Sequence, residues 1–164
     1  KTANQVIAVV HKSNPSFIIP KEKVSIVLDD IQDPGNMGTI IRIADWFGIE
    51  QIFCSLHSVD CYNSKVVQST MASLLRVKIY YTDIEELFRT TELPVYAALL
   101  QGESIFEMKK VNRGFLLIGN ESKGIHPSLL NSSIFPITIP KVGAAESLNA
   151  AVATGIIVSQ ILTR

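Results

Sequence analysis

Short apolar runs alternate with longer segments of helical periodicity, and no other feature of this chain constrains its fold as strongly. The run Val24–Leu28 has the almost unbroken apolar character of a strand that is buried on both faces of a parallel sheet. Similar runs predict further strands at residues 5–11, 51–54, 77–81, 95–100, 115–118 and 134–139. Strands that alternate with helices in this way predict an α/β fold with a mainly parallel sheet flanked by helices.

The predicted helices begin and end at residues that favour those positions. We expect Asn36 to cap a helix whose apolar side chains recur three and four residues apart, and Gly48 to end it. Asp83 is followed three residues later by Glu86, a pair that predicts the start of a helix running to about residue 91. Further helical segments are expected at residues 64–75, 104–107, 127–130 and 147–162.

Composition limits the class of protein. The 164 residues suit one domain, and the hydrophobic fraction of 47% is ordinary for a globular protein. No apolar run approaches the roughly 18 residues of a membrane-spanning helix, and no signal-peptide pattern occurs, so we expect a cytoplasmic protein without a membrane partner. Three histidines and two cysteines lack metal-ligand spacing, which predicts no metal.

Net charge and missing motifs narrow the function further. The formal net charge is zero, whereas a protein that binds RNA alone usually has a basic excess. An RNA partner would therefore be bound partly by a second domain or a second subunit. The chain contains neither the glycine-rich dinucleotide motif nor a P-loop, and it has no nucleophile-elbow motif of the α/β-hydrolases.

Three polar, glycine-containing loops follow predicted strands, where open α/β sheets bind ligands. They comprise residues 36–42, 119–124 and 140–149. In the first, Gly38 leaves space for a ligand backbone beside Arg42, although a surface arginine paired with Asp45 explains the pattern equally simply. In the third, Ser147 can cap the last helix or face a ligand.

Together the three loops resemble the SpoU (TrmH-like) branch of the SPOUT superfamily, whose members are RNA ribose 2′-O-methyltransferases. The matching elements are Asn36-x-Gly38-x-x-x-Arg42, Gly119-Asn120-Glu121-x-x-Gly124, and Ile139-Pro140-x-x-Gly143-x-x-x-Ser147-Leu148-Asn149. The resemblance extends from about Val6 to the end of the chain. Lys141 stands where the family usually has methionine, and Ala150-Ala151 replaces a common Val-Ser.

The resemblance implies a fold and a set of partners. It implies a C-terminal trefoil knot, a homodimer, and S-adenosylmethionine as the co-substrate. Residues 1–164 would form the methyltransferase domain, without the N-terminal RNA-binding domain of larger family members. The substrate would be rRNA or tRNA, and neither the RNA nor the nucleotide follows from the sequence.

The resemblance also assigns residues. Carried over by position, the cofactor would contact Leu99, Gly119, Ile139 and Leu148, largely through backbone groups. The catalytic set would be Arg42, Asn36, Glu121, Ser147 and Asn149. Arg42 would bind a phosphate of the target nucleotide, Asn36 would position the nucleotide or Arg42, and Glu121 would order its loop by accepting backbone N–H groups. Ser147 and Asn149 would fix the third loop and face the substrate, and the proton acceptor is left open.

Two other functions are compatible with such a fold. One is a non-catalytic module that binds RNA or cofactor, and the other is a SPOUT enzyme that methylates a base. The intact polar residues disfavour the first, and the Asn-x-Gly-x-x-x-Arg element favours ribose over base.

Overall fold

The computed structural model describes residues 9–12, 16–131 and 133–163. Six strands form one sheet in the order β3-β2-β1-β5-β4-β6, and every neighbouring pair is parallel, which confirms the predicted class. The strands are β1 (Val24–Leu28), β2 (Gln51–Ser55), β3 (Lys78–Thr82), β4 (Val95–Ser104), β5 (Gly114–Ile118) and β6 (Ile134–Thr138). The helices are α1 (Pro34–Trp46), α2 (Ser64–Ser69), α3 (Ile84–Arg89) and α4 (Ala150–Thr163), with 3₁₀ turns η1 (Ser73–Leu75) and η2 (Pro127–Leu129).

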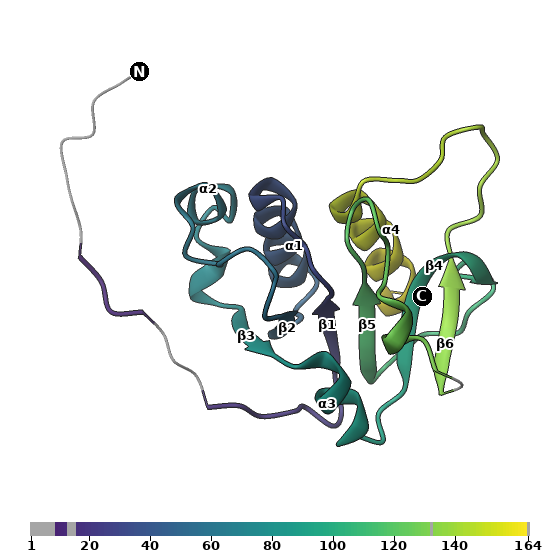
Figure 1. The fold of residues 1–164 in the computed structure, drawn as a ribbon, viewed down its shortest axis with the longest axis horizontal. Coiled ribbons are helices and arrows are strands. Elements are labelled where there is room, and N and C mark those ends of the chain that lie inside the picture. Colours follow the sequence, from purple (N-terminus) through teal and green to yellow (C-terminus); the bar gives the residue numbers. More distant parts are fainter. Residues whose placement is uncertain (1–8, 13–15, 132, 164) are drawn as a thin grey trace.

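Alternating strand residues build two apolar layers, one on each face of the sheet. One layer is covered by α1, α2 and α4, and Figure 1 shows α1 and α4 side by side. The other layer is covered by α3 and η2. Part of the segment before β1 also lies on this second layer, because the Phe17 ring meets the rings of Phe53 and Tyr80 at centroid distances of 5.5 and 5.4 Å.

The two central strands, β1 and β5, form the switch point of the sheet. The chain leaves β1 toward β2 on one side and leaves β5 toward β6 on the other. Open α/β sheets bind ligands at the carboxyl ends of strands at such a point. The loops after β1 and β5 therefore lie where a ligand site is expected.

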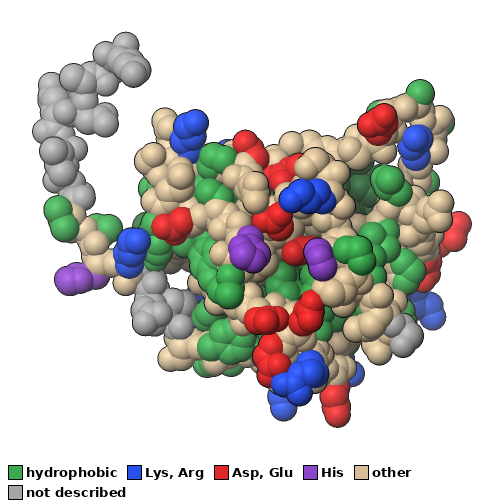
Figure 2. Space-filling view, in the orientation of Figure 1, with side chains coloured by type: hydrophobic (Ala, Val, Ile, Leu, Met, Phe, Trp, Pro, Cys, Tyr) green, Lys and Arg blue, Asp and Glu red, His purple; other side chains and the backbone are tan. Residues whose placement is uncertain are grey.

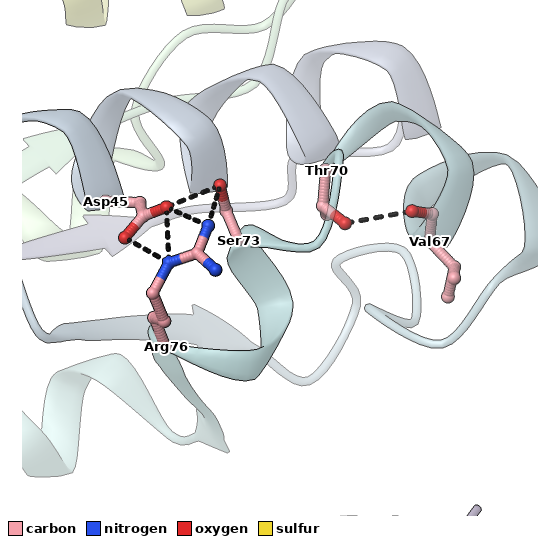
Figure 3. A network of polar contacts seen from close by, with 5 residues as sticks. All are labelled: Asp45, Val67, Thr70, Ser73 and Arg76. Atoms are coloured by element: carbon pink, nitrogen blue, oxygen red, sulfur yellow. Dashed lines mark hydrogen bonds and ion pairs between the residues drawn. The ribbon is translucent and has the colours of Figure 1, made fainter.

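The prediction of one continuous helix at residues 64–75 is wrong, because the structure has two separate elements there, α2 and η1. Met71 and Ala72 have positive φ values of 49° and 71°, and this left-handed pair separates α2 from η1. Ser73 and Arg76 then hold η1 against α1, because Ser73 Oγ and Arg76 Nη2 lie 2.7 and 2.6 Å from Asp45 Oδ2 (Figure 3). Asp45 thus pairs with Arg76, and the alternative that paired it with Arg42 is wrong.

Both long helices begin at other residues than predicted. Asp33 caps α1 by accepting the Asn36 N–H at 2.8 Å, so Asn36 lies inside the first turn. Asn149 caps α4, with its Oδ1 accepting the N–H groups of Ala151 and Val152 at 3.0 and 3.2 Å, so the prediction that Ser147 caps it is wrong. The predicted cap at Asp83 is confirmed by a 3.1 Å bond from the Glu86 N–H.

Two predicted strand boundaries also change. β4 continues to Ser104, beyond the strand predicted at residues 95–100, and its pairing with β6 shifts register between Ala98 and Glu103. A Cβ at Gly102 would lie 2.5 Å from the Pro136 carbonyl oxygen, so glycine allows the strands to stay this close. Of the strand predicted at residues 5–11, residues 9–11 form no strand, and residues 5–8 lie outside the described residues.

Candidate functional site

Three polar side chains, one from each of the three predicted motifs, meet beyond the carboxyl ends of the central strands. The prediction of a loop at residues 36–42 is wrong, because these residues lie inside α1. Asn36 Nδ2 donates to Glu121 Oε1 at 2.9 Å. Asn149 Nδ2 donates to Asn36 Oδ1 at 2.8 Å. Each motif thus contributes one residue to a single hydrogen-bonded chain, which we call the amide–carboxylate cluster (Asn36, Glu121 and Asn149).

The position of Asn36 makes this cluster possible. Its backbone N–H donates to the Asp33 side chain that caps the helix. The residue is 9% exposed, and both the oxygen and the nitrogen of its amide are hydrogen-bonded. Glu121 Oε1 also receives the Asp33 N–H at 3.4 Å. A buried polar group is stable only when it is hydrogen-bonded, so the cluster holds together the loops after β1 and β5 and the start of α4.

The second loop is ordered by Asn120 rather than by Glu121, which corrects our expectation. Asn120 Oδ1 accepts the N–H groups of Ser122 and Lys123 at 2.9 and 3.0 Å, while Glu121 turns to the first loop. Asn120 and Gly124 also exchange two backbone hydrogen bonds. The loop closes so tightly that a Cβ at Gly119 would lie 2.3 Å from the Gly124 carbonyl carbon.

The third loop extends away from the rest of the domain (Figure 1). Residues 140–149 are all exposed, and within the described chain no backbone–backbone hydrogen bond is made by residues 140–148. Val142 is fully exposed and Leu148 is 48% exposed, and neither Leu148 nor Ser147 joins the cluster. The loop therefore offers free N–H and C=O groups and apolar side chains to a ligand.

Leu99 and Ile139, the other two predicted cofactor contacts, are partly buried. Leu99 packs against the apolar layer under α3, and Ile139 packs against the layer under α1 and α4. Gly119 thus begins the second loop, Ile139 directly precedes the third loop, and Leu148 lies within that loop. Leu99 lies on β4, where the pairing of this strand with β6 is interrupted.

Arg42 is not brought to the cluster within one chain. It lies six residues after Asn36, roughly 9 Å along the helix axis. It shares an exposed stripe of α1 with Thr39 and Trp46, and it has no hydrogen-bond or ion-pair partner among the described residues. The expected ligand space at Gly38 is also wrong, because a Cβ there would lie 1.8 Å from Ser69 Oγ, so this glycine lets α2 pack on α1.

A pocket of about 600 Å³, which no sequence pattern predicted, lies beside the second loop and is lined by the ends of β1, β2 and β3. The signal that could have found it is the pair Asp29-Asp30, two carboxylates directly after a buried strand. Within the described residues, no group of histidine, cysteine and acidic side chains could hold a metal ion. The helices of the described chain are all too short or too polar to cross a membrane.

Comparison with known families gives a match over most of the chain. The sequence model of the SpoU rRNA Methylase family matches residues 23–159. A 23S rRNA (guanosine(2553)-2′-O)-methyltransferase, RlmP, from Bacillus subtilis is 31% identical over 96% of this chain. A 23S rRNA (uridine(2479)-2′-O)-methyltransferase from Streptomyces viridochromogenes is 28% identical over 89% of it. This chain covers 64% and 55% of these relatives, so it spans less than two thirds of their length.

Solved structures agree with the sequence match. A TrmH-family RNA methyltransferase from Porphyromonas gingivalis superimposes with a TM-score of 0.80, at 38% identity over 92% of this chain and 62% of that one. An AdoMet-bound rRNA methyltransferase from Sinorhizobium meliloti superimposes with a TM-score of 0.81, at 33% identity over 88% of this chain and 57% of that one.

Proposed function

Because this chain belongs to the SpoU rRNA Methylase family, we propose that the whole protein transfers a methyl group from S-adenosylmethionine to a ribose 2′-hydroxyl of rRNA or tRNA. The amide–carboxylate cluster is the observation that carries this proposal. It ties together the loops that hold the family's polar residues, and all three of its members are present and hydrogen-bonded. The named relatives act on ribose 2′-oxygens, which favours ribose over base.

The residues near the cluster fit the co-substrate. The free backbone groups of residues 140–148 and the exposed Leu148 side chain suit a ligand with a polar amino acid part and a flat aromatic base. Leu99, Gly119, Ile139 and Leu148 would hold it. The sulfonium supplies the activated methyl group, and the protein supplies alignment, which accounts for roughly 7–11 kcal/mol of a barrier in well-oriented reactions. The knotted path of the family would pass through this same tightly packed region around Gly119.

The role of Arg42 depends on a second subunit. Arginine side chains bind phosphates through charge-assisted hydrogen bonds, so Arg42 would bind a phosphate of the target nucleotide and favour formation of the alkoxide. Arg42 lies outside the cluster of its own chain, beside the 84% exposed Trp46. The neighbouring helix α4 exposes Val152 and Ile156 at 51% and 36%. We propose that these outer faces of α1 and α4 pair in a homodimer, and that Arg42 serves the site of its partner.

The catalytic set then divides into two groups. Asn36, Glu121 and Asn149 hold the loops, and Arg42 acts on the RNA across the subunit interface. Ser147, in the exposed third loop, would face the substrate, and a water molecule or a substrate group would take the proton. The enzyme would act in the cytoplasm.

The test is calorimetric titration with S-adenosylmethionine, followed by methyl transfer to total RNA and nucleoside analysis with the full-length protein. We expect Arg42→Lys to retain cofactor binding and to lose most transfer, because lysine cannot reproduce bidentate phosphate binding. Full activity in Arg42→Ala would remove Arg42 from the mechanism. Cofactor binding without transfer by the wild-type protein would favour a non-catalytic module, and a methylated base would favour the base-specific branch.

A further inference from the structure

The pocket of about 600 Å³ lies next to the proposed methyl-transfer site and shares the second loop with it. Its floor is formed where β1, β2 and β3 end, at Asp29, Ser55 and Thr82. Asn120 lines the pocket directly before Glu121 of the cluster in sequence, and its Nδ2 donates to the Asp30 carbonyl oxygen at 2.7 Å. A volume of this size accommodates a nucleoside.

One buried carboxylate in this pocket has an oxygen without a partner. Asp29 is only 7% exposed, and its Oδ2 accepts the His126 N–H at 2.7 Å. Its Oδ1 has no hydrogen-bond partner in the described part of the chain. The fully buried polar atoms without a partner in the described chain are Ser25 Oγ and Gln51 Oε1, so Asp29 Oδ1 is instead open to the pocket and can accept a hydrogen bond from a ligand donor.

The other wall groups select the chemistry of that ligand. Four carboxylates line the pocket against one lysine: Asp29, Asp30, Asp83 and Glu85, with Lys123. Ionised carboxylates only accept hydrogen bonds, so they disfavour a phosphate and favour a group with N–H donors. Figure 2 shows two histidines and several acidic side chains gathered on this face.

The shape of the walls favours a flat ligand. Leu56, Ile84 and Leu129 supply apolar surface, and His57 and His126 supply two imidazole rings at the rim. Proteins recognise unpaired RNA bases by stacking them on such rings and bonding to their edges. Guanine presents two adjacent donors, N1–H and N2–H₂, whereas uracil places its single N–H between two acceptors.

We propose that this pocket binds a guanine base of the substrate RNA, next to the nucleotide that is methylated, and that Asp29 reads its donor edge. This inference rests on the proposed function, because it takes RNA as the substrate. The pocket would thus select the RNA, while the amide–carboxylate cluster and Arg42 serve the transfer itself.

The test uses the whole chain and nucleosides, so that it does not depend on methyl transfer. We titrate guanosine, inosine, uridine and Nα-acetylarginine methylamide into ¹⁵N-labelled protein and follow the amide and imidazole signals of the pocket. We expect guanosine to shift them with a Kd near or below about 1 mM. Inosine lacks the N2 amino group, so it should bind several-fold more weakly, and uridine should bind more weakly still.

Asp29→Asn is the matched variant, because asparagine keeps an acceptor for the His126 N–H and turns a donor toward the pocket. We expect this substitution to weaken the binding of guanosine roughly tenfold or more. Glu92→Gln, an exposed carboxylate outside the pocket, should have no effect. The wild-type comparison of guanosine with inosine decides the question even if Asp29→Asn does not fold.

Four results would overturn the inference: no shifts in the pocket with guanosine, equal affinity for guanosine and inosine, equal affinity for guanosine and uridine, or tighter binding of the arginine derivative. The last would point to a protein partner. If S-adenosylmethionine binding and methyl transfer persist in any of these cases, only the pocket assignment fails and the proposed function stands.

Discussion

At the scale of single residues, side-chain amides and one glycine determine the geometry of the site. Asn149 uses both ends of its amide, because its oxygen caps α4 and its nitrogen reaches Asn36. This double use explains why asparagine, rather than aspartate or serine, suits the position.

Replacing Asn149 by aspartate separates its two tasks. The carboxylate still caps α4, but it cannot donate to Asn36 Oδ1 and faces that oxygen with a negative charge. We expect a loss of roughly 1–3 kcal/mol in the free energy of unfolding and weaker cofactor binding, measured by denaturation and calorimetry. Asn63→Asp, at the exposed cap of α2, is the control and should leave both nearly unchanged. Wild-type values for Asn149→Asp would show that the Asn149–Asn36 bond does not organise the site.

Gly119 is fixed by close backbone approach. A Cβ there would lie 2.3 Å from both the Gly124 carbonyl carbon and the Ile125 nitrogen, and backbone atoms cannot move aside as a side chain can. We expect Gly119→Ala to lower the free energy of unfolding by roughly 1–3 kcal/mol in thermal or denaturant unfolding. Gly143→Ala, where nothing lies within 4 Å of the added carbon, provides the comparison. Equal stabilities for the two variants would contradict this packing.

At the scale of elements, short contacts between helix ends place the loops. The left-handed pair Met71-Ala72 turns the chain from α2 into η1. The carboxylate of Asp45 on α1 then accepts hydrogen bonds from the side chains of Ser73 and Arg76. The hydrogen bond from Arg76, and then that from Ser73, lower the pKa of Asp45 below its ordinary value.

This lowered pKa predicts a pH dependence. A carboxylate with a lower pKa in the folded state stabilises the fold above its unfolded pKa, and the contribution disappears as the pH falls through the folded value. We expect Asp45→Asn to lower the Tm modestly at pH 7, and the difference from wild type to shrink as the pH falls below about 4. Glu22→Gln, which removes an exposed carboxylate without an ion-pair partner in the described chain, should show no such trend. A difference that does not depend on pH would exclude the ion pair as its cause.

At the scale of the whole molecule, the strand order places the loops. β1 and β5 are distant in sequence but adjacent in the sheet, so the loops that follow them are neighbours. The outer faces of α1 and α4 lie on one side of this sheet and expose Trp46, Val152 and Ile156.

Trp46→Glu tests the proposed dimer. A charge on the apolar surface that we expect the dimer to bury should raise the dimer dissociation constant at least roughly tenfold, measured by light scattering over a dilution series. Methyl transfer should fall with the dimer fraction, because Arg42 would no longer reach the partner's site. Val67→Glu places the same charge on exposed α2 and should leave the dimer intact. A wild-type protein that is a monomer at all concentrations would refute the pairing.

The sequence by itself determined the α/β class, the parallel strands and the two loops at residues 119–124 and 140–149, whereas residues 36–42, predicted as a loop, form part of α1. Apolar runs and glycine-containing turns are local features, and the physics behind them acts over a few residues. For the same reason the cap at Asp83 was predictable from the sequence. The helix expected at residues 64–75 is interrupted by the left-handed pair Met71-Ala72, and neither residue type favours that conformation.

Only the tertiary structure decided what those residues touch. It showed that Asn36 bonds to Glu121 and Asn149, that Gly38 serves packing between α1 and α2, and that Arg42 lies apart from the cluster of its own chain. Such contacts join loops that are far apart in sequence, and they follow from the order of strands in the sheet. A side chain acquires its partners from that arrangement, since hydrogen bonds and close packing act over a few ångströms in space and carry no trace in the linear sequence.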